Sequence, residues 1–411
     1  MDGAASPPRG MTGRPDSAGD GIGAVYLDHQ ATTPVDPVVA GRMAPWFAGL
    51  FGNPHSRHRH GSRAEAAVNE ARAQVAALIG ANPHEVVFTS GATEANNLAI
   101  KGVMRAARAS GRDHLVTAAT EHPSVLACCR RLERDGVRVT VLPVDPGGLV
   151  DPRQLSQALT PRTALVSIMT ANHEIGTVQP IGDLAAVARN RGVPFHTDAV
   201  QAAGRIPVDV RGLGVDLVSL CAHKMYGPPG IGALWVSRAV ALEPLMDGGG
   251  QERGLRPGTV PVPLAVGFGA AAELAAAAMP DEARRLAALG DRLLDRLASG
   301  IEGLRVNGLR DGGREGVRER RLPGTLSVVV PGVDAADLMD AVPDVAMASG
   351  AACAAGSDRP SHVLEAIGLG PLDAACSLRL GAGRFTTEAE IDTAAARLVG
   401  AALRLRRESP A

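Results

Sequence analysis

The sequence predicts an α/β protein, with a large domain built on a mainly parallel seven-stranded sheet and a smaller α+β domain. Three observations predict it. Seven apolar runs with strand character lie between residues 86 and 236, helical patterns separate many of them, and the composition changes near Pro280. Regular alternation of strands and helices is typical of a parallel sheet covered by helices. The runs that we expect to be strands are 86–89, 114–117, 137–142, 164–169, 194–197, 217–220 and 231–236.

The segments before and between these strands have distinct patterns. Residues 1–23 are rich in Gly, Pro, Ser and Asp, so we expect a flexible N-terminal extension, and a short strand follows at 24–28. Apolar residues at helical spacing predict helices at 61–79, 94–107, 124–134 and 181–190. The large domain is expected to span 34–280.

The C-terminal third has a different composition. The apolar run 262–279 is mostly Ala and Gly and contains Pro263 and Glu273, which favours a buried or half-buried helix over a membrane span. After it we expect helices at 282–299, 334–341 and 388–404, a strand at 325–330, and a charged, Gly-rich loop at 308–321. The small domain is therefore expected to combine 24–33 with 281–411.

Composition excludes several classes of function. Lys and Arg number 42 against 43 Asp and Glu, and the aromatic residues are six Phe, two Trp and two Tyr. A near-neutral chain with few aromatic rings is not expected to bind nucleic acid directly. The five cysteines form no CxxC pair, so we expect no disulfide framework and no metal site. Residues 1–23 lack the apolar stretch of a signal peptide, so we expect a cytoplasmic protein with no membrane partner.

A first candidate site lies where the strand 86–89 runs into Ser90-Gly91-Ala92-Thr93 and a helix begins. Backbone N–H groups and hydroxyls at a helix N-terminus bind phosphate. Ser and Thr are also favoured as ordinary helix caps, and taken alone this motif is better explained as a cap.

A second candidate site combines two polar clusters, each of which ends an apolar strand, so that both belong at one edge of the sheet. Asp198 follows the strand 194–197, and His223-Lys224 follows 217–220. An ion pair is one interpretation. The other is that Lys224 forms a Schiff base with pyridoxal phosphate while Asp198 keeps the pyridine nitrogen protonated. The second interpretation is strengthened because the chain has one other lysine, Lys101, in a predicted helix with no polar cluster nearby.

A third candidate is Cys353, which lies among Ala, Gly and Ser residues between Ala348 and Ser357. Most free cysteines are small buried hydrophobic residues. A run with so little bulk offers little to bury a side chain, and it suits an accessible nucleophile that has to move.

With these motifs in order, the chain resembles the cysteine desulfurases of the class V aminotransferase family, which are fold type I enzymes dependent on pyridoxal phosphate. The resemblance runs from about residue 25 to 406. It is carried by the motifs at 26–34, 51–54, 89–97, 120–122, 172–176, 198–201, 223–228, 248–252, 256–259, 349–353 and 383–387. The long span from Cys353 to Pro360 resembles the group that serves iron–sulfur cluster assembly and nitrogen fixation.

The resemblance implies a role for each matching residue. Lys224 would hold the cofactor and act as acid and base, Asp198 would pair with the pyridinium, and His122 would stack on the ring. Gln201 and Asn172 would bond the phenolic oxygen, and Arg379 would clamp the substrate carboxylate. Ala92, Thr93, Cys221 and His223 would hold the phosphate, with Thr259 reaching in from a second subunit of a homodimer. Cys353 would attack the sulfur of L-cysteine, carry the persulfide and pass it to a scaffold or sulfur-carrier protein, sharing a cluster only transiently.

Two departures and two alternatives accompany this interpretation. Cys221 stands where a phosphate-binding serine is usual in the family, and His173 stands where a second Asn is common. A selenocysteine lyase, or another lyase or aminotransferase of the same family, is the alternative enzyme. A catalytically silent sulfur-relay or scaffold subunit is the alternative of another class.

Overall fold

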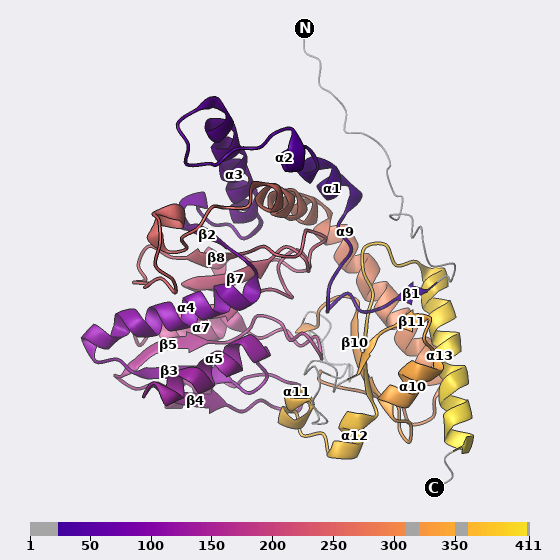
Figure 1. Cartoon of the computed structure of the whole chain (residues 1–411). Coiled ribbons are helices and arrows are strands. Elements are labelled where there is room, and N and C mark those ends of the chain that lie inside the picture. The colour runs from indigo at the N-terminus through magenta and orange to yellow at the C-terminus, as the bar shows by residue number, and fades with distance from the viewer. Residues whose placement is uncertain (1–23, 310–319, 350–360, 409–411) are drawn as a thin grey trace.

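The structure is a computed structural model that describes residues 24–309, 320–349 and 361–408 (Figure 1). Its largest sheet has seven strands in the order β2-β8-β7-β6-β5-β3-β4, which confirms the predicted large sheet. The strands are β2 (Val86–Thr89), β3 (His114–Ala118), β4 (Arg138–Leu142), β5 (Thr163–Ser167), β6 (Phe195–Asp198), β7 (Leu217–Cys221) and β8 (Gly232–Val236). β8 is antiparallel to both of its neighbours, and the remaining pairs are parallel.

Helices cover both faces of this sheet because successive residues of each strand point to opposite sides. Val86 and Phe88 of β2 pack into one core with α3 (Arg59–Leu78), α7 (Ile181–Arg189) and the first half of α9 (Val262–Gly300). Val87 packs into a second core on the opposite face. That core is formed by α4 (Ala92–Ala107) and α5 (Pro123–Arg134). Smaller helices complete this part: α1 (Pro37–Met43), α2 (Pro45–Ala48), α6 (Pro152–Ala158) and α8 (Val210–Leu213).

A separate core lies at the other end of the molecule. An antiparallel sheet in the order β12-β13-β10-β9 and a parallel pair, β1 with β11, enclose it together with α10, α13 and the second half of α9 (Figure 1). The bounds are β1 (Val25–Tyr26), β9 (Arg305–Val306), β10 (Thr325–Val329), α10 (Ala335–Ala341), β11 (Val345–Ala346), β12 (Ala348–Ser349), α11 (His362–Ala366), α12 (Pro371–Ala375), β13 (Ser377–Gly381) and α13 (Glu388–Glu408). The division at residue 280 into two domains stays a proposal.

One expectation was wrong in its details. The segments 262–279 and 282–299 are a single helix, α9, with Pro280 inside it. Proline removes one backbone hydrogen bond from a helix. The helix continues because its two halves are held in two different cores, through residues up to Ala275 on one side and from Leu286 on the other. By length and composition alone α9 could cross a membrane, but half of its apolar window is buried in the described structure, as in a core helix.

Candidate active site

A cavity of about 620 Å³ lies at the carboxyl ends of the large sheet's parallel strands, where β12 and β13 of the smaller sheet face them. This is the edge at which open α/β sheets bind ligands. Eight of the residues assigned from the sequence line it: Ala92, Thr93, His122, Asp198, Gln201, His223, Lys224 and Arg379. Asn172, Cys221 and Thr259 are described but do not line it, and Cys353 lies outside the described residues.

Lys224 follows β7 and extends into the cavity. Its Nζ donates to the backbone carbonyl oxygens of Gln30 and Ala31. Burial lowers the pKa of Lys224 to about 8, because a desolvated ammonium is less stable than a hydrated one. About a tenth to a fifth of this amine is therefore neutral, and nucleophilic, at pH 7.0 to 7.4.

Asp198 ends β6, and its carboxylate is held by two donors. Asn96 Nδ2 donates to Oδ2 at 2.7 Å, and the backbone N–H of Val200 donates to Oδ1 at 3.0 Å. The side chain is nearly buried but lines the cavity. The structure thus presents a fixed carboxylate in the same cavity as the amine of Lys224.

His122 caps the N-terminus of α5 with its own ring. Nδ1 accepts from the backbone N–H of Ser124 at 3.1 Å, and the Ser124 hydroxyl lies 2.8 Å from the same nitrogen. Burial, and then the neighbouring His173, lower the pKa of His122 to about 4. The imidazole is therefore neutral at pH 7. The rings of His122 and His173 meet edge to face with centroids 5.3 Å apart.

The phosphate site expected at α4 has an open helix terminus. Gly91 is the cap residue and supplies no side-chain hydrogen bond, so the first N–H groups of this 16-residue helix remain available beside Ala92 and Thr93. Such groups attract anions through their unused hydrogens and the helix dipole. His223 lies across the cavity, and burial lowers its pKa to about 4. This His is accordingly a neutral hydrogen-bonding partner.

Gln201 and Asn172, both assigned to the cofactor's ring, differ in how many of their side-chain hydrogen bonds are already made within the protein. Gln201 Nε2 donates to the Gln30 carbonyl at 3.0 Å, while its buried Oε1 has no hydrogen-bond partner among the described residues. Asn172 is committed to its own loop, because Nδ2 donates to Thr120 O and Oδ1 accepts from the N–H groups of Glu174 and Ile175. The side-chain oxygen of Gln201 is therefore available for a hydrogen bond with a ligand. Asn172 instead stabilises its own loop, and the next residue of that loop, His173, lines the cavity.

Arg379 projects from β13 into the same cavity. Its Nη2 is 2.7 Å from Asp28 Oδ1, and Nη1 donates to the His173 carbonyl at 3.2 Å. The Arg379 side chain is 7% exposed. Asp28, Asn96, Ser124 and His173 are neighbours to which the sequence assigned no role, although Asp28, Asn96 and His173 lie inside recognised motifs. The contacts that bring them together span up to 351 residues of sequence.

Neither Cys221 nor Thr259 lines the cavity, for different reasons. Cys221 is fully buried, which raises the pKa of its thiol to about 12, and it has no surface in the cavity. Thr259 is exposed and lies away from the cavity of its own chain. Their roles as phosphate ligands stay predictions.

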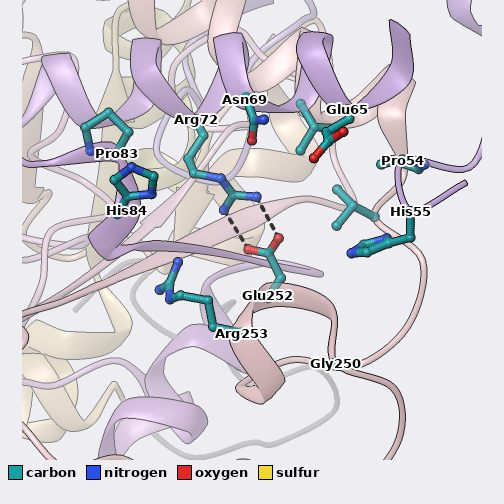
Figure 2. A pocket seen from close by; sticks show the side chains of 12 residues that line it. Pro54, His55, Glu65, Asn69, Arg72, Pro83, His84, Gly250, Glu252 and Arg253 are labelled. Atoms are coloured by element: carbon teal, nitrogen blue, oxygen red, sulfur yellow. Dashed lines mark hydrogen bonds and ion pairs between the residues drawn. The ribbon is translucent and has the colours of Figure 1, made fainter. Parts of the chain in front are cut away.

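The segment that carries Thr259 is anchored firmly. Glu252 and Arg253 adopt left-handed backbone angles, with φ of 48° and 59°. A two-point ion pair at 2.7 Å joins Glu252 to Arg72 of α3 in a cavity of about 470 Å³ (Figure 2). Arg256 also pairs with Glu94 of α4 at 2.9 Å. Buried, bidentate contacts of this kind hold a strained loop in one conformation.

Comparisons with known proteins identify the family of this chain. The Aminotransferase class-V family model matches residues 25–393. A cysteine desulfurase of Mus musculus is 48% identical, with 94% of this chain and 83% of that protein covered. The cysteine desulfurase IscS of Rickettsia rickettsii is 45% identical, with 94% and 93% covered. A solved NifS-like protein has a TM-score of 0.84 at 33% identity, covering 92% of this chain and 98% of that one. The chain belongs to the aminotransferase class-V family.

Proposed function

We propose that this chain is a cysteine desulfurase that uses pyridoxal phosphate to take sulfur from L-cysteine, releasing L-alanine. One observation carries the proposal. A neutralisable amine (Lys224), a fixed carboxylate (Asp198) and an open helix N-terminus (α4) share one cavity. The names of relatives at 45% and 48% identity over most of the chain support the same reaction.

The side chains present fit the proposed cofactor. Its aldehyde requires a neutral amine, its pyridine nitrogen a carboxylate, its phenolic oxygen a polar side chain and its phosphate a cluster of N–H groups. Lys224, Asp198, Gln201 with its unpartnered Oε1, and the start of α4 supply these in turn. When bound, the cofactor would supply an electron sink for the bonds at the substrate's α-carbon.

Residues of the chain would orient the substrate, transfer protons and accept the sulfur. Arg379 would orient the substrate carboxylate, for which its planar fork of donors is suited. Lys224 would exchange a proton at the α-carbon, and neutral His122 would cover the ring and hold a proton at Nε2. Cys353, which the structure does not describe, would receive the sulfur as a persulfide.

The proposed partners follow from that persulfide. It requires an acceptor, and we propose an iron–sulfur scaffold or a sulfur-carrier protein, in a cytoplasmic location. The relative of Rickettsia rickettsii carries the name IscS, which favours the cluster-assembly branch. We propose no direct binding to nucleic acid or to a membrane, because a net charge of −1 leaves no excess of basic residues for either surface.

The proposal is tested by incubating the holoenzyme with L-cysteine, L-selenocysteine or a set of other amino acids in the presence of a reducing thiol. We expect alanine and sulfide in equal amounts from cysteine, and no keto acid. Keto-acid products would indicate an aminotransferase, activity confined to selenocysteine would indicate a lyase, and no turnover with no cofactor absorbance would indicate a silent relay subunit.

The pKa of Lys224 predicts how the rate of cofactor uptake depends on pH. Below about 8 the neutral amine fraction falls about tenfold per pH unit. Mixing cofactor-free protein with pyridoxal phosphate in a stopped-flow spectrometer should therefore give an attachment rate that rises to pH 8 and then levels off. A rate that still climbs steeply at pH 9.5 would show an ammonium with the ordinary lysine pKa.

A homodimer with shared sites is also expected, since Thr259 is exposed and does not reach the cavity of its own chain. Mixing a Thr259→Ala protomer with a Lys224→Ala protomer should produce hybrid dimers. Each hybrid has one site that lacks both groups and one site that is intact, so about half the wild-type activity per hybrid should return. No recovery of activity after subunit exchange, with exchange verified by native mass spectrometry, would contradict a shared site.

A further inference from the structure

We propose that Asn96 and Ser124 are positioning residues that join Asp198 to His122 through a chain of hydrogen bonds and fix the ring proton of His122 on Nε2. The inference deepens the proposed function, since it rests on Asp198 and His122 both facing the cofactor. Neither Asn96 nor Ser124 lines the cavity.

The direction of every hydrogen bond follows from which group can donate. A carboxylate only accepts, so Asn96 has to present its NH₂ group to Asp198, where the distance to Oδ2 is 2.7 Å. The second hydrogen of that NH₂ goes to Ser124 Oγ at 3.0 Å. The amide oxygen of the fully buried Asn96 is left without a hydrogen-bond partner among the described residues. A buried oxygen without a partner destabilises the folded protein. Here it accompanies an orientation of the Asn96 amide in which both NH₂ hydrogens are donated.

The last link fixes the histidine. Having accepted from Asn96, the Ser124 hydroxyl donates its own hydrogen to His122 Nδ1 at 2.8 Å. The backbone N–H of Ser124 donates to the same nitrogen at 3.1 Å. A nitrogen that accepts from a backbone N–H cannot carry a proton, so the neutral ring carries it on Nε2.

The hydroxyl does more than cap a helix. The backbone N–H of Ser124 already provides the capping bond to His122, and alanine would provide it equally well. What alanine would lack is the link to Asn96 and thus to Asp198. The hydroxyl donates to Nδ1 only while that nitrogen is unprotonated, so this hydrogen bond favours the neutral ring.

The charges facing His122 come from several elements. His173 in the loop after β5, Lys224 after β7 and His362 of α11 each lower the pKa of His122, and Asp198 of β6 raises it. Removing the Ser124 hydroxyl leaves all four in place. The remaining effect should be a loss of stabilisation of the neutral ring, which raises the pKa of His122, while the backbone N–H of residue 124 keeps the ring proton on Nε2.

The test is the pKa of His122 in Ser124→Ala, with its tautomer read in the same spectra, by long-range ¹H–¹⁵N correlation of the ¹⁵N-histidine-labelled holoenzyme. The His122→Asn spectrum identifies the signal. In the wild type we expect the Nε2–H pattern and a titration near pH 4. In Ser124→Ala we expect the Nε2–H pattern to persist, because the backbone N–H of residue 124 still donates to Nδ1, and the pKa to be higher by about half to one unit, which is the size of one hydrogen bond. Ser124→Thr should restore the wild-type pKa.

Ser167→Ala is the matched control. It removes a hydroxyl 2.9 Å from Nδ1 of another histidine, His196, in the same sheet, and it should leave the His122 signal unchanged. Asn96→Ala breaks the chain from its other end and should move the His122 signal in the same direction. An unchanged pKa of His122 in Ser124→Ala, or an equal change in Ser167→Ala, would overturn the inference. A wild-type holoenzyme that makes no alanine would refute the proposed function while leaving this readout intact.

Discussion

Cys353→Ala is expected to bind cofactor and substrate normally and yet to release alanine more slowly by on the order of 10³-fold or more. In the proposed reaction the thiolate of Cys353 forms a bond to the substrate sulfur as the carbon–sulfur bond breaks. The electron pair of that bond goes to the carbon, which then takes a proton to become the methyl group of alanine. Because the thiol reacts but does not bind, the loss should fall on kcat and leave KM nearly unchanged.

The four cysteines that the structure describes explain why Cys353 is assigned as the nucleophile, and they provide control variants. Burial raises the pKa of Cys128 to about 11, and that of Cys129 and Cys221 to about 12. Burial also raises the pKa of Cys376. A thiol with so high a pKa is protonated at pH 7 and is a poor nucleophile. Cys376→Ala should therefore retain activity within a few-fold. Near-normal alanine release by Cys353→Ala, measured by single-turnover kinetics with a reductant present, would contradict the assignment.

Lys224→Ala is expected to abolish covalent attachment of the cofactor and to lower turnover by on the order of 10³-fold or more, since the same amine is proposed as the base. Borohydride reduction of the wild-type holoenzyme, followed by peptide mapping, should place the pyridoxyl group on Lys224. The variant should still bind the cofactor without a covalent bond, because the start of α4 and His223 are unchanged.

The chain carries its own matched control in its one other lysine. Lys101 lies eight residues after Thr93 in α4, about 12 Å along the helix axis, and does not line the cavity. Lys101→Ala should keep the covalent cofactor and its activity. A pyridoxyl label on Lys101, or a Lys101→Ala protein without bound cofactor, would remove the basis of the site.

The sequence by itself determined the sheet and the edge at which the site lies. Apolar runs short enough to be strands alternate with helical patterns, and this predicted the seven strands of the large sheet. Polar residues placed directly after two such runs predicted that Asp198 and Lys224 lie at the same edge of the sheet, because parallel strands bring their carboxyl ends to one edge, and both line the cavity there. A count of two lysines then singled out Lys224 as the candidate amine. These features depend on local pattern and composition, which can be read from the sequence without the tertiary structure.

Only the tertiary structure decided the contacts between distant segments and the direction of each side chain. Local pattern gave no sign that β8 inserts antiparallel between β2 and β7, or that α9 continues through Pro280 because two cores hold its halves. Asp28 meets Arg379 across 351 residues of sequence, and Asn96 joins Asp198 to Ser124 from a helix on one face of the sheet. Cys221, by contrast, follows the expected strand and yet is fully buried, away from the cavity. The position of a residue at a strand end follows from local periodicity, but the partner that its side chain meets is set by the packing of every element around it.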